Sequence, residues 1–106
     1  MKEEQIRELI KSGKVVYNEF HIDFRNPFEE QLYELTGDLL QIEYKNGLVL
    51  DIGWYPEMDP NGCLKVHLIK DADWYSPLIC LAARSEREME EALKEVIRIV
   101  EGYNET

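Results

Sequence analysis

The chain is poor in positive charge, and this deficit limits what it can bind. Its 106 residues contain 12 Lys and Arg against 22 Asp and Glu, which gives a formal net charge of −10 at pH 7. A surface field of this sign repels nucleic acid and anionic lipid, and it attracts cationic partners. We therefore expect no nucleic-acid and no membrane partner, and we expect a basic protein partner instead.

Several other features are missing. No apolar run approaches the roughly 20 residues of a membrane-spanning helix, and the first residues lack the apolar segment of a secretory signal, so we expect a cytoplasmic protein. The two cysteines, Cys63 and Cys80, are then expected to be free thiols. Glycine-rich phosphate motifs and nucleophile elbows are absent as well. We expect no cofactor and no enzymatic activity.

The negative charge is concentrated in one part of the chain. Residues 17–59 carry only two bases, Arg25 and Lys45, and have a net charge of −8. The composition still resembles that of a folded domain, because 44% of the residues are hydrophobic and 10% are aromatic, which a disordered acidic tail would lack. The length suits a single domain covering residues 1–106. The ten acids of this part are Glu19, Asp23, Glu29, Glu30, Glu34, Asp38, Glu43, Asp51, Glu57 and Asp59.

Periodicity predicts a helix at each end of the chain and a sheet between them. Apolar residues at helical spacing predict a helix over 2–12, with Gly13 as its C-terminal cap. Ser85 and Glu88 form a capping box that begins a second helix, which Gly102 is expected to end. Five strands are predicted between the helices, over residues 14–24, 39–45, 48–55, 64–70 and 77–83.

Short turns connect these strands. Asn46-Gly47 accepts positive φ at both central positions and predicts a tight hairpin. Asp59-Pro60-Asn61-Gly62 predicts another turn, with Gly62 as its left-handed residue. Since short turns join antiparallel neighbours, we predict an α+β fold: a five-stranded antiparallel meander with both helices on one face. In the first strand, Val16, Phe20, Ile22 and Phe24 are expected to face the core.

The other face of the sheet should be open and polar, and strand parity places both histidines on it. An alternative function is therefore a small metal-dependent or acid/base enzyme that uses His21, Asp23 and His67. The spacing matches no zinc motif, and solvated side chains on the wet face would give the same pattern. Another alternative is a homodimer that pairs through this open face. Asp59 and Asn61 resemble the start of a calcium loop, but position twelve is Lys70 rather than Glu, which favours a structural turn.

Two Trp-Tyr pairs flank the predicted turns. We expect Trp54 and Trp74 to converge, because the end of the third strand and the start of the fifth are expected to lie at the same end of the meander. Aromatic residues rimmed by acids are typical of a binding hot spot for an Arg- or Lys-rich partner. The alternative is that both tryptophans pack in the core. The predicted partner-binding residues are Trp54, Glu57, Asp59, Asp71, Asp73 and Trp74.

The strings Gly53-Trp54-Tyr55-Pro56-Glu57-Met58-Asp59-Pro60-Asn61-Gly62 and Lys70-Asp71-Ala72-Asp73-Trp74-Tyr75-Ser76-Pro77-Leu78 resemble a pattern in small bacterial proteins. In size, acidity and helix–sheet–helix layout the chain is also similar to immunity proteins of polymorphic and contact-dependent toxin systems. That resemblance implies a cytoplasmic protein that binds and blocks a cognate toxin, often a basic nuclease, without catalysis of its own. We therefore expect a non-enzymatic acidic binding protein that neutralises a basic protein partner.

Overall fold

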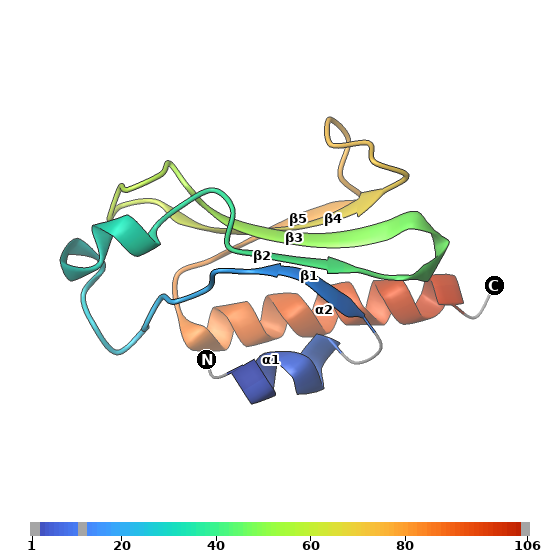
Figure 1. Cartoon of the computed structure of the whole chain (residues 1–106), viewed down its shortest axis with the longest axis horizontal. Coiled ribbons are helices and arrows are strands. Elements are labelled where there is room, and N and C mark those ends of the chain that lie inside the picture. Colours follow the sequence, from blue (N-terminus) through green and yellow to red (C-terminus); the bar gives the residue numbers. More distant parts are fainter. Residues whose placement is uncertain (1–2, 11–12, 105–106) are drawn as a thin grey trace.

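A computed structural model describes residues 3–10 and 13–104 of the chain. It shows an α+β fold in which five antiparallel strands follow one another in the order β1-β2-β3-β4-β5, and both helices lie on one face of this sheet (Figure 1). The predicted fold class is confirmed. The elements are α1 (Glu3–Ile10), β1 (Lys14–Asn18), β2 (Leu40–Glu43), β3 (Leu48–Tyr55), β4 (Cys63–Lys70), β5 (Ile79–Ala83) and α2 (Glu86–Asn104).

The core lies between the sheet and the two helices. Buried and less buried residues alternate along β2 and most of β4, as the period of a strand requires, whereas β3 is buried at every position from Leu50 to Trp54. The apolar stripe of α2 packs against the sheet, and its residues Met89, Leu93 and Val96 are fully buried. Each such side chain contributes roughly 1.5–3 kcal/mol to stability through burial. Ile6 and Ile10 of α1 are also buried in this layer.

The hairpin between β2 and β3 forms at the predicted position. Asn46 and Gly47 both have positive φ, 64° and 73°, as expected for this dipeptide. The connection contains three residues, Lys45–Gly47, and the Tyr44 N–H donates to the Leu48 carbonyl at 2.8 Å. The bounds of β3 agree with the prediction of 48–55.

The first strand is shorter than predicted. β1 ends at Asn18, and a bulge lies between Val15 and Tyr17. Because a bulge inserts an extra residue, it reverses the side-chain parity before it. Val16 is the extra residue of this bulge and has no partner in β2. It is 42% exposed, and the prediction that it faces the core was wrong. Phe20 and Ile22 beyond the strand are buried as predicted.

The predicted helix ends need correction. The Ser85 Oγ accepts from the Glu88 N–H at 3.1 Å, which confirms the start of α2. Gly102 does not end α2, because the helix continues to Asn104. Gly13 serves close packing: a Cβ there would lie 2.4 Å from Ile42 Cγ2. The predicted helix residues 2, 11 and 12 lie outside the described residues.

The long connection between β1 and β2 contains two short 3-10 helices, Phe28–Glu30 and Leu32–Glu34. It lies at the end of the sheet where β3 ends, beside the β3–β4 turn (Figure 1). Neither helix in the described part of the chain is long and apolar enough to span a membrane.

Candidate functional site

Two segments that are far apart in the sequence meet at one end of the sheet. The Met58 N–H donates to the Leu35 carbonyl, and the Trp54 N–H donates to the Thr36 carbonyl, both at 2.7 Å. The Tyr55 hydroxyl donates to the Gly37 carbonyl at 3.1 Å. These bonds join residues 27–38 to Trp54 and to residues 55–59, and we call residues 27–38 and 55–59 together the acidic end.

The acidic end combines negative charge with exposed apolar surface. Its two segments contain six carboxylates and no Lys or Arg. Four large hydrophobic side chains are exposed among them, Tyr33 by 88% and Met58 by 52%. Aromatic and Met side chains are enriched in protein interfaces, and the surrounding carboxylates attract a basic partner. The carboxylates are Glu29, Glu30, Glu34, Asp38, Glu57 and Asp59, and the other two exposed hydrophobic residues are Leu32 and Tyr55.

Trp54 is buried beneath the acidic end. Its side chain is fully buried, its ring centroid lies 4.7 Å from that of Phe28, and its indole N–H donates to the Asp59 carbonyl at 2.7 Å. The Arg84 guanidinium lies over the Phe28 ring, with 4.9 Å to the centroid, and donates to the carbonyls of Gly62 and Pro60. Because Arg84 donates to backbone carbonyls of the β3–β4 turn, it stabilises this turn and not the carboxylates of the acidic end.

Glycine is required where residues 27–38 cross β3 and in the β3–β4 turn. A Cβ at Gly53 would lie 2.0 Å from the Gly37 carbonyl oxygen, and one at Gly62 would lie 2.6 Å from the Tyr55 carbonyl oxygen. The prediction that Gly62 is the left-handed residue of the turn was wrong, because the positive φ of 55° belongs to Met58. The backbones therefore approach each other closely, which holds the acidic end against the sheet.

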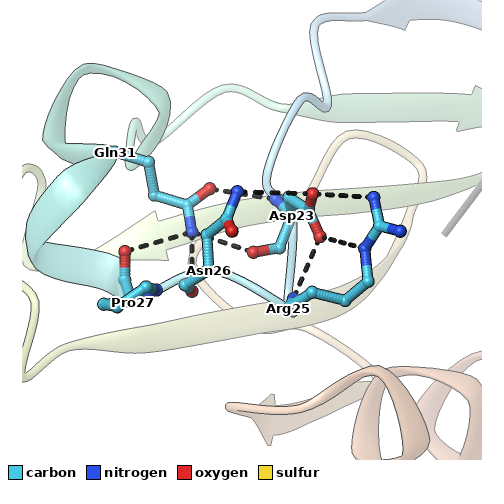
Figure 2. Close-up of polar contacts among 5 residues, drawn as sticks. All are labelled: Asp23, Arg25, Asn26, Pro27 and Gln31. Carbon is cyan, nitrogen blue, oxygen red and sulfur yellow. Dashed lines mark hydrogen bonds and ion pairs between the residues drawn. The ribbon is translucent and has the colours of Figure 1, made fainter.

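A polar network fixes the chain where it enters the acidic end (Figure 2). The Asp23 carboxylate accepts from the Arg25 side chain at two atoms, both at 3.0 Å, and from the Arg25 N–H at 2.9 Å. These bonds hold the pKa of Asp23 at about 2. The Gln31 amide bonds both the N–H and the carbonyl of Asp23, each at 2.9 Å. The network thus ties the first 3-10 helix to the segment before it.

Only part of the predicted partner-binding set lies at the acidic end. Glu57 is exposed there, and Asp59 is half-buried. Trp54 is buried beneath the surface, as the core alternative expected, so it supports the site rather than offering a side chain for contact. The Asp59 Oδ1 accepts from the Asn61 N–H at 2.8 Å, which makes it part of the turn itself.

Asp71, Asp73 and Trp74 lie at the opposite end of the sheet. The register pairs Leu48 with Lys70, so the β4–β5 connection adjoins the start of β3, and the Asp71 N–H donates to the Gly47 carbonyl. The predicted convergence of the two tryptophans was wrong. In a meander β3 and β5 run parallel, so the end of one and the start of the other lie at opposite ends (Figure 1).

The open face does not assemble the predicted metal or acid/base site. His21 pairs with Glu19 at 3.1 Å near the β1 edge, and two strands, β2 and β3, separate β1 from the strand that carries His67. His67 instead lies 3.9 Å from Asp51, which also accepts from the Gln41 amide at 3.0 Å. Burial raises the pKa of Asp51. Within residues 3–10 and 13–104, no group of three or more His, Cys, Asp or Glu could hold a metal ion.

Sequence reasoning found the acids of this site but not its shape. Tyr33 and Met58 were not singled out, although their exposure makes them the main apolar contacts available. The excess of acids in residues 17–59 was the available signal, because it covers both segments of the acidic end. Comparisons of the chain with family models, with curated proteins and with solved structures found no match.

Proposed function

We propose that this chain is a non-enzymatic, cytoplasmic binding protein whose acidic end neutralises a basic protein partner. The observation that carries the proposal is the meeting of six carboxylates and four exposed hydrophobic side chains, without any Lys or Arg, in the two joined segments. The carboxylates would steer a basic partner toward this end, and the apolar side chains would hold it there.

A toxin immunity role follows from the same chemistry. A basic nuclease binds substrate phosphates through Lys and Arg, and carboxylates can occupy the same positions. The partner would then be blocked by occlusion of its site, and no reaction would be needed. Glu57 is the predicted residue best placed for this, since it is exposed beside Tyr55 and Met58.

The proposal is tested by capture from lysates of the source organism with three forms of the protein. The wild type is compared with an acidic-end variant, E29Q/E30Q/E34Q/E57Q, and with a matched variant that loses four charges elsewhere, D71N/D73N/E90Q/E101Q. Capture is done at low salt and again at roughly 0.5 M salt, where charges are strongly screened.

We expect the wild type and the matched variant to recover one basic protein at low salt, and the acidic-end variant to lose it. All three should have similar melting temperatures, because the changed residues lie on the surface. Equal recovery by the acidic-end variant would contradict the proposal.

A further inference from the structure

The outer edge of β5 is open to an added strand. β5 is the last strand of the sheet, and no other strand of the described chain lies beside its outer edge. Residues 77–83 contain no charged side chain. Proteins usually protect sheet edges with charges, bulges or a covering segment. The other edge has such protection: β1 begins with Lys14 and contains a bulge.

A groove of about 270 Å³ lies between β5 and α2. Its apolar lining comes from Leu81, Ala82 and Ala92. Its remaining lining is acidic, from three carboxylates spaced along one side of α2, Glu88, Glu91 and Glu95. The groove therefore presents both apolar contact and negative charge directly beside the free strand edge.

Two of these carboxylates are available to a cationic ligand. Glu91 and Glu95 form ion pairs with Arg87 and Arg98 of the same helix, on exposed side chains. Exposed pairs of this kind stabilise a protein by at most about 1 kcal/mol, so exchange for a ligand's cation costs little. Glu88 differs, because its carboxylate accepts from the Arg84 N–H at the start of α2.

We infer that this edge and groove bind an extended basic peptide segment, which adds a sixth strand to the sheet. Main-chain hydrogen bonds would hold the segment against β5. Every second side chain of an added strand points to the same face. Lys or Arg at these positions would meet Glu91 and Glu95, while the alternate positions would lie on the open face beside the exposed side chain of Cys80.

A second copy of this chain does not suit the site. Twofold pairing of β5 with itself would place the two α2 helices side by side on one face, with their carboxylate rows facing each other. Like charges in such an arrangement cost binding energy. The site is also separate from the acidic end, because it lies on β5 and α2 and includes none of residues 27–38 or 55–59.

The test uses the full chain and a fluorescein-labelled, N-acetylated nonapeptide of alternating Arg and Val. Affinity is measured at low salt, and amide hydrogen exchange is followed by NMR with and without the peptide. We expect slower exchange in β5 and no change in β1. We expect E91Q/E95Q to weaken peptide binding about tenfold, because it removes two exposed charge contacts. We expect the control variant E90Q/E101Q, on the same helix, to leave the affinity unchanged.

Circular dichroism of both variants checks that each remains folded. The inference is overturned if the peptide does not bind. It is equally overturned if the peptide slows exchange in residues 27–38 or 55–59 instead of β5, because a polycation would then have bound only the acidic end. Either result leaves the proposed function of the acidic end to its own test.

Discussion

The same dipeptide, Trp-Tyr, stands near each end of the sheet and has opposite environments there. Trp54 is fully buried and Tyr55 is 39% exposed, whereas Trp74 is 49% exposed and Tyr75 is 99% exposed. Trp54 belongs to β3, where strand parity points it inward, and residues 27–38 cover that end. Trp74 lies in the connection between β4 and β5. The position of a residue in its element, rather than its local sequence, decides its role.

The largest predicted effect concerns the two tryptophans themselves. Trp54→Ala should lower the free energy of unfolding by about 3–5 kcal/mol, because it removes a large buried ring. Trp74→Ala should change it by no more than about 0.5 kcal/mol, the range for exposed positions. Urea unfolding followed by circular dichroism measures both. Similar losses of unfolding free energy in the two variants would contradict the difference in burial between Trp54 and Trp74.

A smaller effect is expected where the acidic end crosses β3. Gly53→Ala should destabilise the protein by about 1–3 kcal/mol, because the added methyl would meet the Gly37 carbonyl oxygen and would push the acidic end away from the sheet. Gly102→Ala is the matched control, since a Cβ there meets nothing within 4 Å in α2. It should stabilise by up to about 1 kcal/mol. Thermal unfolding measures the change in stability of both variants. A change of the same sign in both would contradict the close approach of Gly53 to the Gly37 carbonyl.

The smallest effect concerns Asp51, which lies on the open face between the two ends. Burial raises its pKa in the folded protein, so the folded state holds the proton more tightly than the unfolded state does. Its contribution to stability is therefore favourable at low pH and is lost as the pH rises from about 4 through the raised pKa. Asp51→Asn should stabilise the protein at pH 7, by less than the glycine effects, and this gain should shrink toward pH 4. Urea unfolding at pH 7 and at pH 4 measures this gain in stability. An equal gain at the two pH values would contradict the raised pKa of Asp51.

Much of the fold could be predicted because its signals are local. The bounds of β3, the Asn46-Gly47 turn and the Ser85 cap each depend on a few neighbouring residues. The bulge in β1 was not predictable in this way, because Val15 and Val16 are equally apolar and only pairing with β2 decides which one faces the core. Gly62 was misread for a similar reason: its role depends on the backbone of Tyr55, and not on the turn alone.

The candidate site was harder to predict than the fold. Charge counting identified the acids, but the assembly of the acidic end depends on contacts between segments about twenty residues apart, such as the Met58 N–H with the Leu35 carbonyl. The role of Trp54 followed from strand parity, which the sequence contains, whereas the exposure of Tyr33 depends on the path of an irregular connection. Sequence patterns are weakest for such connections, because they lack the periodicity of helices and strands.

The most direct test of the account places the same photo-cross-linker at each end. Tyr33 and Tyr75 are both highly exposed tyrosines, at 88% and 99%, and they lie at the acidic end and at the β4–β5 connection respectively. Each is replaced in turn by p-benzoylphenylalanine in cells of the source organism, and the cells are irradiated. We predict a cross-link to a basic protein from position 33 and none from position 75. A cross-linked partner from position 75 alone would contradict the claim that the acidic end is the binding surface.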